Sequence, residues 1–395
     1  MLFKKNVAWK EAARIFGLSR LMILVFWYPC VTFVPMITPH KYIVSKACTT
    51  IATSIPCFLL SWGHWDTVHY VEIAHNGYMH PENTVYFPFF PLLIRSVGFL
   101  LGGSVIADYA AGLILANSCF YGVLVLFYVL VSEDFGHTVA KYALTYLAFA
   151  PYALFFFIGY TESLFLLLTL AVFYFLRREK PLGWWLAGLC GFLGALTRPT
   201  GIILIVPFLV LFMQRFGIRT LLRREHWWQK VSAILSMALI PAGLLTYMLY
   251  QQIRFGNPLL FIAEEGRIWH HYTSFPWTGI FNAIQEIVMQ GPYYLGDTSD
   301  VLLTLIPLVA LIIGWKRLPL HYSLFSLTMM LFVLCEPRQY QPLLSVPRYF
   351  LVIFPIFILF ALWSQNRCVA WHLMVPSVLL FIMHITQYAI YSWAT

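Results

Sequence analysis

The sequence is short of charge, and this excludes a soluble globular protein. Only 10% of its 395 residues are Asp, Glu, Lys or Arg, whereas a soluble domain carries about 25%. Hydrophobic residues make up 61% of the chain. They recur in runs of about 20 residues, each long enough to cross the ~30 Å hydrocarbon core of a bilayer. The composition therefore predicts an integral membrane protein that crosses the bilayer many times.

Motifs that bind nucleotides or catalytic metals are also lacking. The sequence has no phosphate-binding G-x-x-x-x-G-K-[ST] loop, no G-x-G-x-x-G fingerprint and no H-E-x-x-H motif. Its 7 cysteines include no C-x-x-C pair and no spacing typical of a metal site. We therefore expect no cofactor and no essential metal ion. Cys48 and Cys57 could form a disulfide in an oxidising compartment, but we expect free apolar side chains.

The apolar runs predict an all-α polytopic membrane protein with about 11 transmembrane helices. The expected spans lie near residues 17–36, 105–131, 138–158, 162–176, 183–197, 199–214, 231–250, 301–315, 320–335, 348–363 and 371–391. Aromatic residues gather near the ends of these runs, as they do at membrane interfaces. We expect residues 1–395 to form one transmembrane domain, whose first run is a retained span rather than a cleaved signal peptide.

Basic residues form short strips between apolar runs, for example in residues 177–180 and 215–230. Such strips hold loops in the cytoplasm. The net charge of +9 is therefore a topology signal, and we expect no nucleic-acid partner. Arg20 is grouped with these cytoplasmic charges. The predicted topology has the N-terminus inside and the C-terminus outside.

Two segments on the predicted outer side, residues 37–104 and 251–300, are too long to be plain connectors. Within the first, residues 64–76 are expected to be helical. The stretch "FPFFPLLIRSVGFLLGG", residues 87–103, is apolar but interrupted by Arg95 and two prolines. We predict that it is an amphipathic helix lying in the membrane interface.

The stretch "SWGHWDTVHYVEIAHNGY", residues 61–78, gathers ionisable groups between two apolar regions. On a helix Asp66 and His69 share a face, and Glu72 follows three residues later. Partial burial raises the basicity of a carboxylate, which suits a general base acting on a sugar hydroxyl or on water. The alternative is an interfacial helix whose polar face is simply solvated. The spacing alone leaves both interpretations open.

Three more charged residues stand at predicted outer ends of spans: Glu162 in "GYTESLF", Arg198 in "ALTRPTG" and Arg348 in "SVPRYF". Charged groups at such depth are usually paired or functional. One interpretation is a structural Glu–Arg pair. The other is a pair of arginines that bind the phosphate of a lipid, for which guanidinium geometry is well suited.

These motifs together resemble a known family. "WDTVHYVEIAHNGY" (65–78), followed by "YFPFFPLLIR" (86–95), resembles the signature of the PIG-V family, the GPI mannosyltransferase 2 type. "YTESLF" (160–165), "ALTRPTG" (195–201) and "VPRYF" (346–350) are similar to its later motifs, in the expected order. The resemblance extends over most of the chain. It implies a GT-C-type fold with a helical first outer loop and an active site on the outer or lumenal face.

The resemblance also implies a reaction. Mannose would pass, with inversion, from a polyprenyl-phosphate mannose donor of the dolichyl type to a glycan or glycolipid acceptor. Asp66 would be the general base and His69 a second catalytic residue, while Arg198 and Arg348 would bind the donor phosphate. The residues implied to orient the substrates are Trp65, Tyr78, Arg95 and Glu162.

The cellular location and the reaction class have alternatives. Because the chain has no N-x-[ST] sequon and no C-terminal retrieval signal, we favour a bacterial plasma membrane over the endoplasmic reticulum membrane. Another GT-C enzyme with a different lipid-phosphate sugar is the first rival, although such enzymes usually show Asp-Glu where this chain has Asp66-Thr67. A transporter or lipid flippase is the second, but its polar residues would lie near the midplane. An inactive scaffold is the third.

Overall fold

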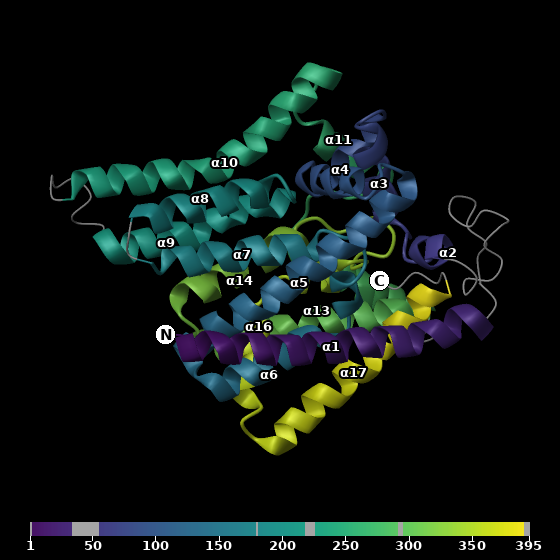
Figure 1. Cartoon of the computed structure of the whole chain (residues 1–395). Helices are drawn as coiled ribbons and strands as arrows, with labels where there is room; N and C mark the ends of the chain where they lie inside the picture. Colours follow the sequence, from purple (N-terminus) through teal and green to yellow (C-terminus); the bar gives the residue numbers. More distant parts are fainter. Residues whose placement is uncertain (1, 34–54, 179–180, 218–225, 291–294, 391–395) are drawn as a thin grey trace. The chain divides into compact units, whose positions relative to one another are not determined.

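The computed structural model describes residues 2–33, 55–178, 181–217, 226–290 and 295–390 (Figure 1). Among these residues every named element is a helix, and one isolated bridge pairs His271 with Arg338. The expected all-α class is therefore confirmed. The chain divides into two compact units, which are described separately, and the single transmembrane domain stays a prediction.

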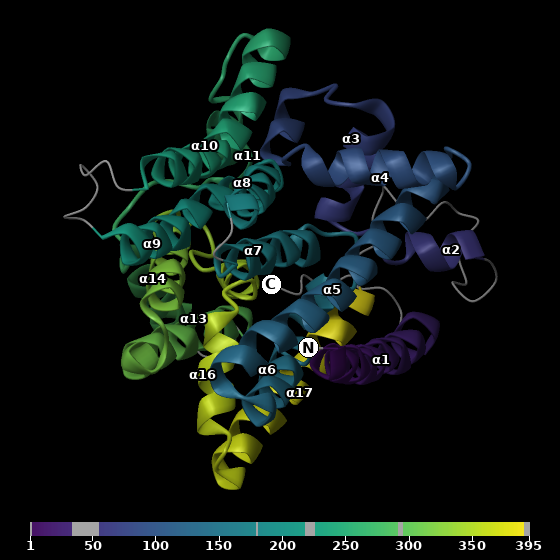
Figure 2. The same cartoon turned by 60° about the vertical axis from the view of Figure 1, so that its left-hand side comes forward.

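The first unit comprises residues 1–79, 90–164 and 360–395. Its elements are α1 (Leu2–Phe33), α2 (Ile55–Leu60), α3 (Asp66–Asn76), α4 (Phe89–Leu100), α5 (Val105–Phe135), α6 (His137–Ala148), the 3-10 helix η3 (Ala153–Phe156) and α17 (Arg367–Ala389). α1 packs against α5, α6 and α17, while α3 packs against α5 (Figures 1 and 2). The helical character expected of the first outer segment is confirmed over its described part.

The second unit comprises residues 80–89 and 165–359, so that α4, α7 and α16 cross its boundaries. Its elements are η2 (Pro81–Val85), α7 (Glu162–Leu176), α8 (Pro181–Ala195), η4 (Pro199–Leu204), α9 (Ile205–Phe216), α10 (Trp227–Phe255), α11 (Leu260–Trp269), α12 (Thr278–Gln290), α13 (Leu295–Gly314), η6 (Trp315–Arg317), α14 (Leu320–Leu334), α15 (Val346–Phe350) and α16 (Pro355–Trp363).

Glycines bring α8 and α10 together in the second unit, where the two helices run side by side (Figures 1 and 2). A Cβ on Gly188 would lie 2.1 Å from the carbonyl oxygen of Ser236, and a Cβ on Gly243 would lie 2.4 Å from that of Phe192. Small residues allow helix backbones to approach closely in membranes, where van der Waals packing drives helix association. The two helices therefore pack backbone to backbone.

Every predicted span corresponds to a helix, but not always to an unbroken one. Within the described part of the chain, six helices are long and apolar enough to cross a membrane, and four shorter apolar helices accompany them. The predicted span 138–158 is interrupted: α6 ends at Ala148, shortly before Pro151. The predicted span 348–363 divides into α15 and α16, which begins at Pro355. Proline disfavours a helical conformation at the residue before it and lacks an N–H donor. The count of about 11 stays a prediction.

Two sequence-based interpretations need correction. Cys57 is disulfide-bonded, so the expectation of a free apolar side chain is wrong for this residue; Cys48 lies outside the described residues. Arg20 is only 8% exposed within α1, so it does not belong to a solvated cytoplasmic strip. Both residues belong to the first unit.

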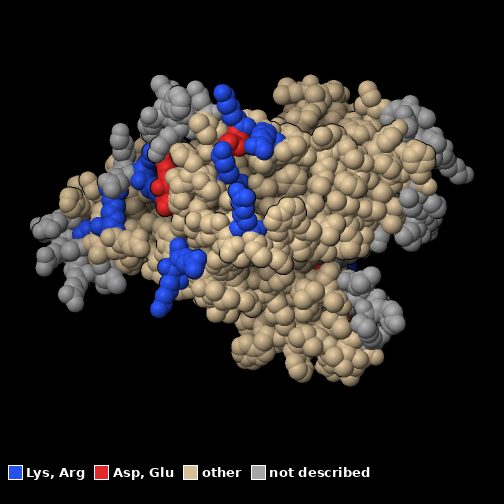
Figure 3. Space-filling model, turned by 90° about the horizontal axis from the view of Figure 1, so that it is seen from below, with Lys and Arg blue, Asp and Glu red and all other residues tan. Residues whose placement is uncertain are grey.

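The face of the molecule seen in Figure 3 is mostly uncharged. Figure 3 shows Lys and Arg as a few blue groups on a largely tan face. Large apolar side chains are exposed instead, among them Leu100 on α4 and Val288 on α12. Such surface is typical of a protein that lies in lipid. α4 has 12 residues and extends about 18 Å, which is too short to cross the hydrocarbon alone, so its interfacial placement stays a prediction.

Candidate active site

The proposed catalytic carboxylate begins a helix. α3 starts at Asp66, and the expected helix over this motif is confirmed. The positive end of the helix dipole stabilises an acidic side chain in the first turn. Trp65, just before it, has φ 45° and ψ −118°, a conformation that bulky L-residues rarely adopt and that costs about 1–3 kcal/mol. The side chain of Asp66 is half-buried, so it is accessible to a substrate.

An aromatic cluster supports the strained turn. The rings of His64 and Tyr388 stack at 4.6 Å, and the ring of Trp65 lies edge-on to Tyr388 at 5.2 Å. The Tyr388 hydroxyl donates to the carbonyl oxygen of Trp62 at 2.7 Å. Trp62 in turn stacks on Trp27 of α1 at 4.3 Å. Because strain persists only where the surroundings over-determine it, this cluster fixes the direction in which the chain enters α3.

A loop that connects α6 to α7 meets the same helix end. The backbone N–H of Asp66 donates to the hydroxyl of Tyr160 at 3.2 Å. Gly159, one residue earlier, packs so closely that an added Cβ would lie 3.1 Å from the Cγ2 of Thr67. The first turn of α3 is therefore held by a segment that lies almost a hundred positions further along the chain.

α3 has one partly exposed polar face and one buried face, as the sequence predicts. His69 is half-buried one turn after Asp66, whereas Tyr70 is buried and meets the ring of Phe90 edge-on at 5.4 Å. Glu72 is half-buried one turn further. The structure therefore places Asp66, His69 and Glu72 along one accessible stripe of α3.

The other end of α3 has its own contacts. Arg95 of α4 donates from Nη1 to the carbonyl oxygens of Ala74 and His75, at 3.1 and 3.3 Å. The Nδ1 of His75 lies 2.8 Å from the Oδ2 of buried Asp108 on α5. Nine residues of helix separate this end from Asp66, or about 13 Å. The structure thus assigns Arg95 a contact that holds α3, at a distance from the carboxylate.

Two other predicted site residues of the first unit are buried. Glu162 begins α7 and is 1% exposed, while Tyr78, which follows α3, is 8% exposed. Ser163, next to Glu162, donates to the carbonyl oxygen of Phe156 at 3.1 Å. This bond ties the first turn of α7 to the loop that carries Tyr160.

In the second unit, the two predicted phosphate-binding arginines share one aromatic ring. The guanidinium carbons of Arg198 and Arg348 each lie 5.0 Å from the ring centre of Tyr349. The Nη2 of Arg348 also donates to the Tyr349 hydroxyl at 3.3 Å. Both arginines are nearly buried. Their side chains are therefore neighbours, held by cation–π contacts, although 150 positions lie between them in the sequence.

A glycine fixes the turn that presents Arg198. Arg198 has an extended backbone and precedes η4. A Cβ on Gly201 would lie 2.4 Å from the carbonyl carbon and oxygen of Gly194 and 2.5 Å from the Cα of Ala195. At Gly201 the start of η4 thus lies directly against the backbone at the end of α8, which sets the position of the arginine between them.

The predicted outer segment, residues 251–300, is hydrogen-bonded to the segment that precedes Arg348. The N–H of Tyr272 donates to the carbonyl of Pro337, and the N–H of Ser274 donates to that of Cys335. The Nδ1 of His271 lies 2.7 Å from the carbonyl oxygen of Glu336. Burial lowers the pKa of His271 to about 4, with the Arg338 charge acting in the same direction and the Glu336 carbonyl opposing them. We name residues 270–274 and 335–339 the outer strip, after the side of the membrane on which the sequence predicts them.

A salt-bridge group lies beside the outer strip in the sequence. Arg267 on α11 donates to the buried carboxylate of Glu264 and lies 3.7 Å from the carboxylate of Glu82 on η2. The bond to Glu264 raises the pKa of Arg267. The group fastens α11 to η2.

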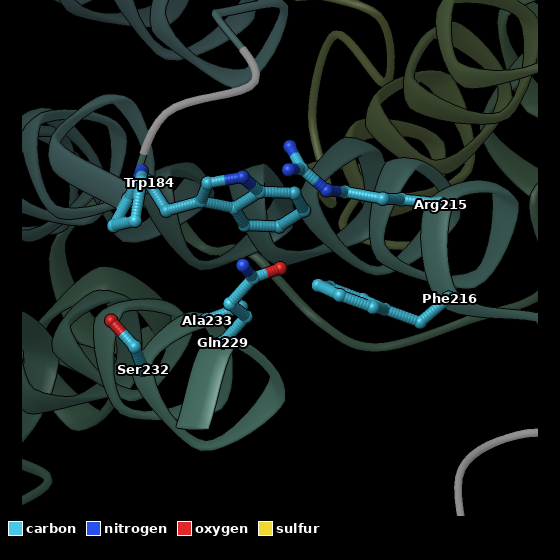
Figure 4. A pocket seen from close by; sticks show the side chains of 7 residues that line it. Trp184, Arg215, Phe216, Gln229, Ser232 and Ala233 are labelled. Carbon is cyan, nitrogen blue, oxygen red and sulfur yellow. The ribbon is translucent and has the colours of Figure 1, made fainter. Parts of the chain in front are cut away.

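A small pocket lies at the ends of α8, α9 and α10. Its lining residues are Pro181, Trp184, Arg215, Phe216, Gln229, Ser232 and Ala233. Figure 4 shows Arg215 and Phe216 extending toward Trp184, whose ring centre lies 6.0 Å from the guanidinium carbon. None of the predicted site residues lines it, and its helix ends belong to the predicted cytoplasmic side. It is therefore separate from the candidate site.

Residues 11–277 match the family described as Mannosyltransferase (PIG-V). The chain belongs to this family. GPI mannosyltransferase 2 of Cryptococcus neoformans is 32% identical to this PIG-V member over 197 residues, which are 46% of this chain and 44% of that protein. GPI alpha-1,6-mannosyltransferase 2 of Mus musculus is 28% identical over 255 residues, 56% of this chain and 50% of that protein. The chain spans about half the length of these curated relatives.

Two solved structures share the fold of this PIG-V chain. The Archaeoglobus fulgidus oligosaccharyltransferase in complex with Zn and sulfate has a TM-score of 0.54 and 11% identity, covering 94% of this chain and 53% of that chain. ArnT from Cupriavidus metallidurans bound to undecaprenyl phosphate has a TM-score of 0.51 and 12% identity, covering 96% and 76%. The expected GT-C-type fold is confirmed.

Sequence reasoning missed two tyrosines that contact predicted site residues, Tyr160 and Tyr349, and it missed the burial of Arg20. Tyr160 lies inside the motif "YTESLF" and Tyr349 inside "VPRYF". Their place in these motifs was the signal that could have identified them. Aromatic residues near span ends are typical of membrane interfaces, so neither tyrosine stood out. Arg20 had no signal besides its charge inside an apolar run.

Proposed function

We propose that this protein is a membrane mannosyltransferase. It transfers mannose from a polyprenyl-phosphate mannose donor, of the dolichyl type, to a glycan or glycolipid acceptor. The observation that carries this proposal is the placement of Asp66: a half-buried carboxylate on the first turn of α3, fixed by a strained turn and by Tyr160. Membership of the PIG-V family supports mannose as the transferred sugar.

The proposed chemistry follows from one carboxylate and one leaving phosphate. Asp66 takes the proton from an acceptor hydroxyl, and that oxygen attacks the anomeric carbon of the donor. The bond from this carbon to the phosphate oxygen breaks on the opposite face, so the configuration inverts and polyprenyl phosphate leaves. His69 lies one turn along the same face of α3 and binds a hydroxyl of acceptor or donor.

Negative charge grows on the departing phosphate, and buried cations stabilise it. Arg198 and Arg348 supply this stabilisation in the proposal, because Tyr349 holds both guanidinium groups in place before the donor arrives. Trp65, Tyr78, Arg95 and Glu162 orient the substrates. For Arg95 this includes holding the C-terminal carbonyls of α3.

We place the active site on the outer or lumenal face, and we retain the bacterial plasma membrane as the favoured location. The disulfide at Cys57, eight residues before Trp65, supports this face, since disulfides persist in oxidising compartments. A lipid-borne donor presents its phosphate at the same depth as residues that flank the spans. No nucleic acid and no metal ion take part in the proposal.

The test compares wild type with Asp66→Asn in detergent or vesicles, using polyprenyl-phosphate mannose labelled in the sugar and a panel of glycan acceptors. Asp134→Asn, the same change at an exposed residue of α5, is the matched control. We expect transfer by wild type and control, and a loss of about 10²–10⁴ in kcat for Asp66→Asn.

Three outcomes would count against the proposal. Equal rates for wild type and Asp66→Asn would overturn the role of the carboxylate. Consumption of another polyprenyl-phosphate sugar in place of the mannose donor would overturn the choice of sugar. Movement of the intact donor across a vesicle, with no transfer, would replace the enzyme by a transporter.

A further inference from the structure

Arg20 is a charged residue inside an apolar helix. It lies in the stretch of α1 that is long and apolar enough to span a membrane, and it is 8% exposed. Charged side chains in such helices are costly, and they mark functional positions or face the protein interior with partners. The partners of Arg20 therefore show what the charge is for.

The partners come from two other parts of the first unit. The Nε of Arg20 donates to the side-chain oxygen of Asn117 on α5 at 2.8 Å. Its Nη2 donates to the backbone carbonyl of Phe156 at 2.8 Å. The guanidinium carbon also lies 4.4 Å from the ring centre of Phe120. The planar fork of donors thus joins α1, α5 and the loop after α6 at one point.

Asn117 holds the next carbonyl of the same loop. Its Nδ2 donates to the carbonyl of Phe157 at 2.9 Å and to that of Leu113, within α5, at 2.8 Å. Two consecutive carbonyls, of Phe156 and Phe157, are therefore held by adjacent polar side chains. Removal of the guanidinium leaves the first carbonyl with only its bond from Ser163. It also removes the donor to the side-chain oxygen of Asn117, whose amide holds the second carbonyl.

Three residues further along, this loop meets the proposed catalytic helix. Tyr160 accepts from the N–H of Asp66. A Cβ added to Gly159 would lie 3.1 Å from the Cγ2 of Thr67, and a Cβ added to Gly112 of α5 would lie 3.6 Å from the Cα of Gly159. No flexible side chain separates Gly159 from these neighbours. A shift of the Phe156–Phe157 carbonyls thus passes to Tyr160 through a short, closely packed backbone segment.

We infer that Arg20 is a positioning residue for the active site: it anchors the loop whose Tyr160 sets the start of α3 and hence the place of Asp66. This inference rests on the proposed role of Asp66. A near 1 Å misplacement of a catalytic group lowers the rate about 10²-fold. Lysine does not replace Arg20, because an ammonium group lacks the planar fork that reaches both Asn117 and the Phe156 carbonyl.

The kinetic test uses Arg20→Lys, Arg20→Met, Tyr160→Phe and the double variant Arg20→Met/Tyr160→Phe. Arg14→Met is the control, since Arg14 lies on the same helix with a 70% exposed side chain. We expect kcat to fall about 10²-fold in both Arg20 variants, with the donor KM within about threefold of wild type and no change in the control. The double variant should be no slower than Arg20→Met, because the two residues act through one contact.

Multiplying effects in the double variant, or an unchanged kcat in Arg20→Met, would overturn the inference. If Arg20→Met does not yield folded protein, Arg20→Lys takes its place in the same cycle.

A second measurement is independent of activity. Hydrogen–deuterium exchange should quicken in peptides that cover residues 64–70 and 156–161 when Arg20 is replaced, and stay as in wild type for Arg14→Met. Faster exchange in 156–161 alone would break the link to α3 and refute the inference. Absence of mannose transfer by wild type would instead remove the proposed function, while this exchange result would still decide whether Arg20 positions Asp66.

Discussion

Replacing Gly201 by alanine should disable the arginine site without touching either arginine. The new Cβ would lie 2.4 Å from the carbonyl carbon and oxygen of Gly194 and 2.5 Å from the Cα of Ala195. All three are backbone atoms, so no side-chain rotation relieves the overlap. An ordinary contact begins at 3.4 Å, so η4 and the end of α8 must separate by about 1 Å.

Two magnitudes follow from this separation. Overpacking of this kind costs about 1–3 kcal/mol of stability, and a shift of Arg198 by about 1 Å lowers the transfer rate by about 10²-fold. Gly17→Ala is the control, because nothing lies within 4 Å of its Cβ and alanine favours the α1 helix by about 1 kcal/mol.

The assay records the thermal unfolding midpoint and the rate of mannose transfer for both variants. We expect a lower midpoint and a slower rate for Gly201→Ala, with neither in Gly17→Ala. Equal midpoints and equal rates in the two variants would show that η4 and α8 do not pack through this glycine, which would refute the reasoning.

Two other changes test separate parts of the second unit. Tyr349→Leu should raise the donor KM about tenfold or more, whereas the donor KM of Tyr349→Phe should stay close to that of wild type. The reason is that the face of the ring makes most of the contact with Arg198 and Arg348. Similar KM values for all three proteins in the transfer assay would contradict this. Because the folded-state pKa of His271 lies near 4, below its ordinary 6.5, the outer strip should lose stability as pH falls from about 6.5 to 4, since the unfolded form binds the proton first. Amide exchange in residues 270–274 against pH measures this, and the loss should disappear in His271→Gln; an identical pH profile in that variant would exclude His271 as the cause.

The sequence predicts local features of this protein better than its long-range contacts. A helix over residues 64–76 is predicted from the sequence, and α3 begins two residues later, at Asp66. Both "TRPTG" and "VPRYF" point to the arginines. The break after α6 was missed because the residues around Pro151 are as apolar as a span. Tyr160 and Arg20 were missed for a different reason: their meaning lies in bonds to Asp66 and Phe156. No spacing rule connects positions so far apart.

The outer strip joins two pieces of chain that are distant in the sequence. Residues 270–274 are bonded to residues 335–339, and the second of these segments continues, within a few residues, to Arg348. A molecule that docks on the outer segment and displaces it therefore pulls on the segment leading to α15 and the arginine motif. Most of this connection is made by backbone hydrogen bonds, so side-chain substitutions on residues 270–274 would leave most of it in place.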